Sequence, residues 1–207
     1  MIRASRGFAA ALLTVFSVAL AGCAALFMGV AGSDGLGYAG DGPSKLRIAI
    51  YEPRRPLLVP HAAMVIHAPE GHLIYDPAGW TPDPRGHRRA DVTYSVTPEI
   101  ERAFLLREEA PMALAVLRSV VQPESWELYL FETEVSDEVA SEAARLARDR
   151  PALPKTGCAL GVSTLLRQLP GYEDINPCWL PSTLLRALKG RDDLTLTQTL
   201  VPLAQGG

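Results

Sequence analysis

The amino-acid sequence predicts an α+β fold in which helices pack against a small antiparallel sheet. Two apolar segments separated by a four-residue turn, Ala68–Gly71, indicate a hairpin and therefore antiparallel pairing. Helix-start signals follow further strand-like segments, and the final third of the chain contains two helix-like segments. The chain has 207 residues, of which 48% are hydrophobic. Once the N-terminal part is set aside, residues 46–207 suffice for one domain with a substantial core.

The N-terminal residues have the pattern of a secretory signal. Two arginines precede an apolar stretch, Phe8–Leu20, which is followed by small residues and Cys23. This ending resembles the bacterial lipobox, in which the cysteine is acylated and becomes the mature N-terminus. We therefore expect a signal peptide over residues 1–22 and a lipid anchor on Cys23. A second interpretation stays open, because residues 8–31 are long enough to remain as a membrane-spanning helix.

Either interpretation places the rest of the chain outside the cytoplasm, in the bacterial cell envelope. The expected partner is the membrane, reached through the lipid anchor on Cys23. Residues 31–45 contain five glycines and few side chains that could pack. We therefore expect a flexible linker over residues 23–45 and a folded domain over residues 46–207.

Strands and helices are expected in mixed order along the domain. The expected strands are Leu46–Tyr51, His61–His67, His72–Asp76, Val92–Val96 and Trp126–Thr133. The expected helices are one from Pro98 to about Glu108 with Thr97 as N-cap, Met112–Val121, one from the N-cap Ser136 to about Arg148, Gly157–Leu169 capped by Thr156, and one that begins at Pro181 and has Gly190 as its C′ residue.

The hairpin turn sets the register of its two strands. If His67 pairs with His72, then Ala63 lies opposite Asp76, and Asp76 becomes a diagonal neighbour of His61 on the same face. Diagonal partners have Cα atoms about 7 to 8 Å apart, a separation that an imidazole and a carboxylate can bridge. An aspartate so placed would orient His61 and stabilise its cationic form. His67 shares this face but lies near the turn, where we expect it to be exposed.

Cys158 lies in the first turn of a predicted helix. The free N–H groups and partial positive charge of a helix N-terminus favour a thiolate over a thiol. The same groups could stabilise the oxyanion of a tetrahedral intermediate. Cys158 is therefore the candidate nucleophile, and His61 is the candidate base.

Four motifs in a fixed order carry a family resemblance. HAAMVI begins at His61, LIYDPAG contains Asp76, TGCALGVSTLLRQLPG contains Cys158, and the Pro-led segment PSTLLRAL follows. This order resembles the circularly permuted branch of the NlpC/P60 papain-like superfamily, which includes YaeF/YiiX-like bacterial proteins and lecithin:retinol acyltransferase-like enzymes. The resemblance implies a papain-like α+β fold with Cys158 as nucleophile, His61 as base and Asp76 as the residue that orients the base.

Composition and spacing argue against two classes of function. Lys plus Arg number 20 against 23 for Asp plus Glu, and no basic run is interleaved with aromatic residues, so nucleic acid is not an expected partner. The four histidines lack the spacing of a local metal site, so neither a metal nor another cofactor is expected.

Two functional hypotheses remain. The first is a lipid-anchored cell-envelope thiol hydrolase or acyltransferase that acts on an amide or ester carbonyl, with a peptidoglycan peptide as first substrate and a lipid acyl group as second. The alternative is a non-catalytic envelope lipoprotein, a binding or assembly module. In that case Cys158 and Cys178 would form a structural disulfide, because exported domains tend to pair their cysteines.

Overall fold

The computed structural model describes residues 37–54, 59–78, 88–89, 91–106, 126–154 and 156–201. The expected signal peptide over residues 1–22, the lipidation site Cys23 and the expected helix Met112–Val121 lie outside the described residues. All described residues belong to one compact unit, Leu36–Gly207.

The described strands form one seven-stranded sheet in the order β4-β5-β3-β2-β1-β6-β7, and each neighbouring pair is antiparallel. The strands are β1 (Lys45–Pro53), β2 (His61–Ala68), β3 (Gly71–Tyr75), β4 (Arg88–Arg89), β5 (Val92–Tyr94), β6 (Trp126–Glu134) and β7 (Thr195–Val201). With the helices packed on this sheet, the α+β prediction is confirmed.

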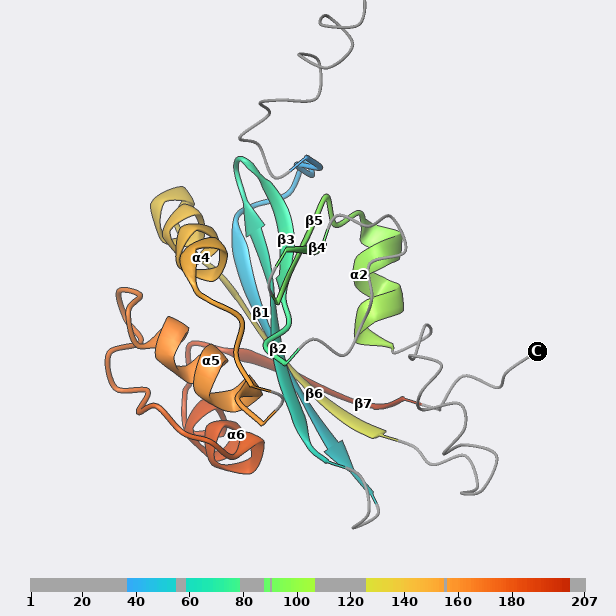
Figure 1. Ribbon diagram of the computed structural model, residues 1–207, viewed down its shortest axis with the longest axis vertical. Coiled ribbons are helices and arrows are strands. Elements are labelled where there is room, and N and C mark those ends of the chain that lie inside the picture. Colours follow the sequence, from blue (N-terminus) through green and yellow to red (C-terminus); the bar gives the residue numbers. More distant parts are fainter. Residues whose placement is uncertain are drawn as a thin grey trace, which may run out of the picture. The chain divides into compact units, whose positions relative to one another are not determined.

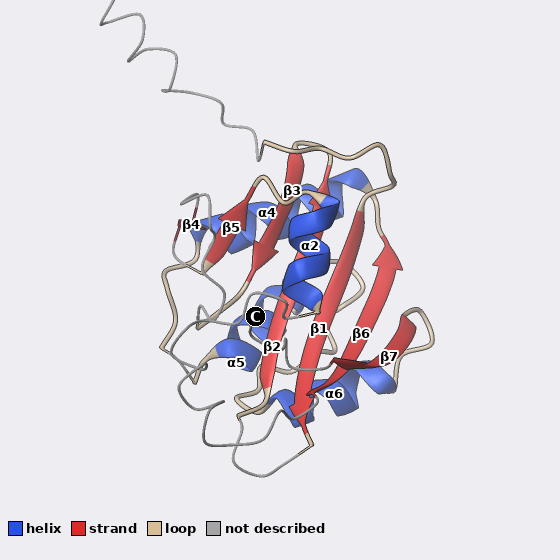
Figure 2. Ribbon diagram, turned by 90° about the vertical axis from the view of Figure 1, so that its right-hand side faces the viewer, coloured by secondary structure: helices blue, strands red, loops and turns tan. Residues whose placement is uncertain are grey.

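Helices cover both faces of the sheet (Figures 1 and 2). The described helices are α2 (Pro98–Leu105), α4 (Asp137–Asp149), α5 (Cys158–Leu166) and α6 (Pro181–Lys189). Helices α4, α5 and α6 lie on one face, and α2 lies on the other. Among the described residues, none of these helices has the length and apolar character needed to cross a bilayer.

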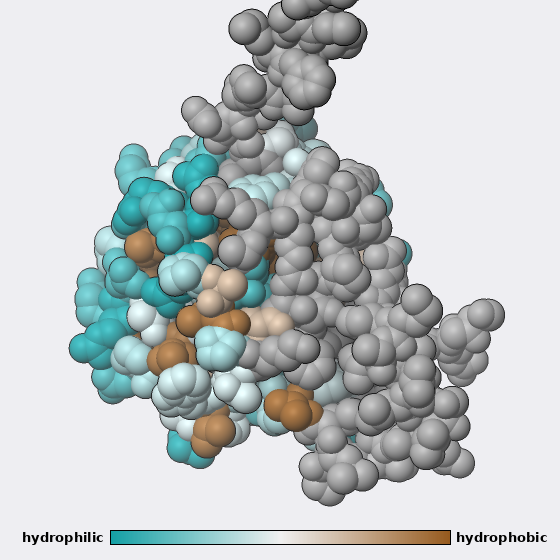
Figure 3. Space-filling view, viewed as in Figure 1, coloured by the Kyte–Doolittle hydropathy of each residue, from teal (hydrophilic) through white to brown (hydrophobic). Residues whose placement is uncertain are grey.

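Helix α4 is amphipathic and turns its polar side to solvent. Its buried residues are all alanines, at positions 140, 143, 144 and 147, a spacing that places them on one side of the helix. The surface over α4 is accordingly mostly hydrophilic in the space-filling view, whereas hydrophobic residues are scattered among polar ones nearer α5 and α6 (Figure 3). Trp179 and Leu180, directly before α6, are among the exposed hydrophobic residues.

Strand β2 separates two hydrophobic cores. Met64 and Ile66 point into the core under α4, α5 and α6, whereas Ala63 and Val65 point into the core under α2. Because successive side chains of a strand alternate between faces, a strand with both faces covered is apolar almost throughout. This burial on both sides explains why the strand signal of HAAMVI is continuous.

Two predicted helix starts are confirmed. Thr97 accepts a hydrogen bond from the backbone N–H of Ile100 at the start of α2, and Ser136 accepts one from Val139 at the start of α4. Each side chain thereby satisfies one of the N–H groups that a helix start leaves without a partner in the helix.

The prediction for α5 is wrong at both ends. The N-cap is Gly157 and provides no side-chain cap, so Thr156 does not have the predicted role. At the other end, Gln168 and Leu169 donate their N–H groups to Leu165 and Leu166, three residues earlier. The last turn is therefore tighter than an α-helix, and α5 ends at Leu166 rather than at Leu169.

Candidate active site

His61 and Asp76 meet at one end of the β2–β3 hairpin. The register is the predicted one, because His67 pairs with His72 and Met64 pairs with Tyr75. His61 Nε2 lies 2.6 Å from Asp76 Oδ1, and the two residues are only 1% and 3% exposed. A contact this short between buried polar groups fixes the orientation of the imidazole ring.

Cys158 is the first residue of α5 and is buried. Burial alone would raise the pKa of its thiol, but a hydrogen bond with His61 and the charge of His61 lower it. Backbone hydrogen bonds from Ala62 and Ala159 lower it further, and the result is a pKa below the usual value. Because N–H donors stabilise a thiolate, these backbone groups act as a small anion-binding site.

The two nitrogens of the His61 ring have different roles. His61 Nε2 bonds to the carboxylate of Asp76. An ionised carboxylate can only accept a hydrogen bond, so Nε2 carries the proton. Nδ1, the other ring nitrogen, can then accept the proton of the Cys158 thiol, whose pKa His61 lowers. Asp76 therefore selects the tautomer that a base needs.

Tyr51 supports the ring of His61 from β1. The two rings are stacked with their centroids 6.3 Å apart and an interplanar angle of 25°. The Tyr51 hydroxyl lies 3.3 Å from each of the carbonyl oxygens of Phe104 and Leu105, at the C-terminal end of α2. One side chain thus connects the helix on one face of the sheet to the candidate base.

Asp91 joins the segment that carries Asp76 to the segment that leads into α5. Its backbone carbonyl accepts the N–H of Asp76 at 2.8 Å, and its carboxylate accepts the N–H of Leu153 at 2.8 Å. Asp91 has a φ of 57°, a left-handed conformation that aspartate tolerates better than most residues. Sequence reasoning missed Asp91, because the contacts join parts of the chain that are far apart in sequence.

Gly161 allows α5 to approach the hairpin closely. A Cβ atom at this position would lie 2.8 Å from the Tyr75 hydroxyl oxygen and 2.8 Å from a ring carbon of Pro77. Both of these residues flank Asp76 in the sequence. The absence of a side chain at Gly161 therefore lets the helix that carries Cys158 reach the end of β3.

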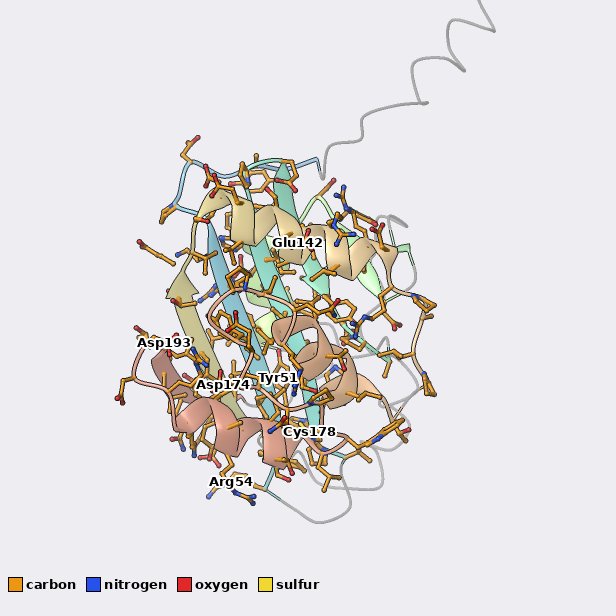
Figure 4. All side chains as sticks on the ribbon, turned by 90° about the vertical axis from the view of Figure 1, so that its left-hand side faces the viewer. Tyr51, Arg54, Glu142, Asp174, Cys178 and Asp193 are labelled. Atoms are coloured by element: carbon orange, nitrogen blue, oxygen red, sulfur yellow. The ribbon has the colours of Figure 1, made fainter. Side chains whose placement is uncertain are left out.

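Cys158 and Cys178 are both free thiols, so the structure does not contain the disulfide of the alternative hypothesis. Cys178 lies between α5 and α6 (Figure 4), where its backbone N–H donates to Ser163 Oγ at 3.0 Å. Burial raises the pKa of the Cys178 thiol, and a hydrogen bond with Ser163 opposes this effect only in part. The pKa values of the two thiols are thus shifted in opposite directions.

His67 is not exposed, contrary to the prediction. Its Nε2 atom lies 2.7 Å from Glu101 Oε2, and its ring stacks on His72 with a centroid separation of 3.9 Å. Helix α2 brings Glu101 over the turn end of the hairpin, a long-range contact that the sequence pattern did not indicate. Within the described part of the chain, no group of three or more His, Cys, Asp or Glu side chains is arranged to hold a metal ion.

Comparisons of the chain with protein-family models, with curated proteins and with solved structures gave no match.

Proposed function

We propose that this protein is a lipid-anchored cell-envelope thiol hydrolase or acyltransferase that uses Cys158, His61 and Asp76. The observation that carries the proposal is the connected arrangement of these three residues. His61 bonds Asp76 through Nε2 at 2.6 Å and is hydrogen-bonded to the Cys158 thiol, whose pKa is lowered. A nucleophile, a base and an orienting acid connected in this way are typical of covalent acyl transfer.

The proposed reaction has two steps. His61 Nδ1 takes the thiol proton, and the Cys158 thiolate attacks the carbonyl carbon of an amide or ester. Collapse of the tetrahedral intermediate breaks the bond to the leaving amine or alcohol, which receives the proton from His61, and a thioester on Cys158 remains. Water or a second nucleophile then gives a proton to His61 and attacks the thioester, which releases the acid or a new acyl product and regenerates the thiol.

Membership in the permuted NlpC/P60 papain-like superfamily is part of this proposal. It is supported by the order of the motifs and by the contact between the strand histidine and the following aspartate. The expected location in the envelope makes a peptidoglycan peptide the first substrate class. A lipid acyl ester or amide is the second, because enzymes of the branch that the sequence resembles act on acyl groups.

The reactivity of the two thiols tests the proposed nucleophile. Iodoacetamide near pH 6 should label Cys158 about tenfold or more faster than Cys178, because only the thiolate reacts and the pKa values are shifted in opposite directions. His61→Ala should remove most of this preference. The matched control is His67→Ala, on the same face of β2 but bonded to Glu101, and it should leave the preference intact. Equal labelling of both thiols, unaffected by His61→Ala, would favour the binding-module hypothesis.

Activity is tested by incubating the full chain with peptidoglycan stem peptides and, separately, with phospholipid vesicles. Intact mass spectrometry should detect an acyl adduct on Cys158 with one of the two substrates, and Cys158→Ser should form no thioester. Cys178→Ser serves as the control and should retain the adduct, because Cys178 has no part in the proposed chemistry. A Cys158→Ser variant with undiminished turnover would contradict the assignment.

The anchor is tested separately from the chemistry. Lipobox processing should remove residues 1–22 and leave a diacyl or triacyl group on Cys23, which intact mass detects directly. Cys23→Ser should block processing and change how the protein partitions with membranes. An unmodified chain that keeps residues 1–22 and stays in the membrane would indicate a spanning helix instead.

A further inference from the structure

The two edges of the sheet differ in length and charge. Strand β4, at one edge, consists of only two residues, Arg88–Arg89. Strand β7 lies at the other edge (Figure 2). It has seven residues, TLTQTLV, and none of them is charged. Proteins usually protect an edge strand by making it short or by placing charged residues or proline on it. Strand β4 is protected in this way, whereas β7 is not.

The outer side of β7 is open in the described part of the chain. Its inner side pairs with β6 along the whole strand, and no other described strand pairs with it. Every residue from Thr195 to Leu200 is exposed, including Leu196 at 41% and Leu200 at 54%. Open backbone groups together with exposed leucines are suited to pairing with another strand.

The sequence of β7 is nearly symmetric about its central residue. Reading outward from Gln198, the chain has threonine on both sides and then leucine on both sides. An antiparallel pair centred on Gln198 would therefore place Leu196 opposite Leu200 and Thr197 opposite Thr199. We propose that β7 pairs with β7 of a second copy of this chain, in a two-fold dimer with Gln198 opposite Gln198.

The charge pattern and the size of this contact are compatible with a dimer. Because β7 carries no charge, self-pairing brings no like charges into opposition, and Leu–Leu and Thr–Thr cross-strand pairs are favourable. A two-fold contact of this kind closes on itself, so the assembly stops at two copies. Seven paired residues span about 24 Å and bury less than a standard interface of roughly 1,600 Å². We therefore expect a weak dimer whose population rises with protein concentration.

Cysteine cross-linking of the full chain in membranes tests both the partner and the register. Gln198→Cys should give a disulfide-linked dimer under mild oxidation, because directly opposite residues have Cβ atoms about 4.5 to 5.5 Å apart. Thr195→Cys is the matched control on the same exposed strand. In the proposed register its two copies lie about 20 Å apart, so it should cross-link no more than the wild-type chain.

Charge introduced at the centre of the strand should separate the copies. Gln198 contacts Glu127 on β6, so Gln198→Lys can keep a partner within its own chain while it places two lysines opposite each other across the dimer. Sedimentation velocity should show a loss of dimer for Gln198→Lys and no loss for Thr195→Lys. A monomer at every concentration, equal cross-linking of the Gln198→Cys and Thr195→Cys variants, or an adduct of Gln198→Cys with a different protein would each overturn the proposal.

Discussion

At the residue scale, the proposed chemistry depends on which nitrogen of His61 carries the proton. Asp76 holds that proton on Nε2 and leaves Nδ1 to accept the proton of Cys158. A substitution at Asp76 therefore tests the tautomer without removing the base itself.

Asp76→Asn should slow the alkylation of Cys158 near pH 6 by roughly tenfold, less than His61→Ala does. The amide of asparagine can turn its NH₂ group towards Nε2, which favours the tautomer with a proton on Nδ1 and removes the acceptor for the thiol. The measurement is the alkylation rate of Cys158 against pH, in which the midpoint should move to higher pH. An unchanged midpoint would mean that Asp76 has no influence on the thiolate.

The sequence predicted some of these residues because their placement follows from short-range rules. A four-residue turn and the two-residue period of strands are sufficient to place His61 next to Asp76. The backbone donor at Ala159 agrees with the predicted helix N-terminus at Cys158, whereas the donor at Ala62 was not predicted, because it lies on β2 and depends on how α5 packs against that strand. The sequence also missed Tyr51, whose stacking on His61 depends on how β1 pairs with β2.

At the scale of elements, the site depends on how closely α5 packs against the hairpin. Gly161→Ala should destabilise the protein by about 1 to 3 kcal/mol, because the new Cβ would lie 2.8 Å from Pro77 and Tyr75. This steric cost exceeds the gain of about 1 kcal/mol that alanine brings to a helix interior. The displacement of α5 should also slow the alkylation of Cys158, which is the readout specific to the site.

Gly190→Ala is the matched control for this prediction. Gly190 follows α6, and a Cβ atom there would meet nothing closer than 3.5 Å. Urea unfolding should therefore show little change for Gly190→Ala and a clear loss of stability for Gly161→Ala. If both variants unfold at the same urea concentration as the wild type, close packing at Gly161 is not a constraint on the fold.

Elements with strong local signals were predicted better than elements that depend on the sheet. The starts of α2 and α4 follow from N-cap residues and were predicted at the correct positions. Strand β7 was not predicted, although leucine and threonine alternate along it. Leu196 and Leu200 of this strand are exposed. The strand therefore has no buried apolar face that would distinguish its sequence from that of a polar loop.

At the scale of the whole molecule, the two ends of β2 hold different polar groups. His61 and the candidate site lie at the start of the strand, and His67 lies about 20 Å away near its end. There His67 stacks on His72, bonds Glu101 and completes a cluster in which Arg47 also bonds Glu101. Helix α2 is thus held to the sheet by ionisable groups as well as by apolar packing.

Within this cluster, His72 has a pKa far below its usual value. Burial lowers its pKa to about 4, and the neighbouring His67 and Lys45 add to the shift, which Glu101 opposes in part. Its neutral Nε2 atom accepts the backbone N–H of Gly40 at 3.2 Å, a bond that a protonated ring cannot accept. The folded protein therefore favours the neutral form of His72.

Because the pKa of His72 falls from 6.5 to about 4 on folding, the unfolded chain binds the proton first as the pH decreases. The contribution to stability is present above pH 6.5 and is lost as the pH falls towards 4. Allowing for solvent screening, we expect this loss to be about 1 to 2 kcal/mol. His72→Gln keeps an acceptor for Gly40 but cannot titrate, so its free energy of unfolding should change less between pH 6.5 and 4.5. Urea unfolding of both proteins across this range measures the difference, and parallel curves would show that His72 does not control the acid stability of the fold.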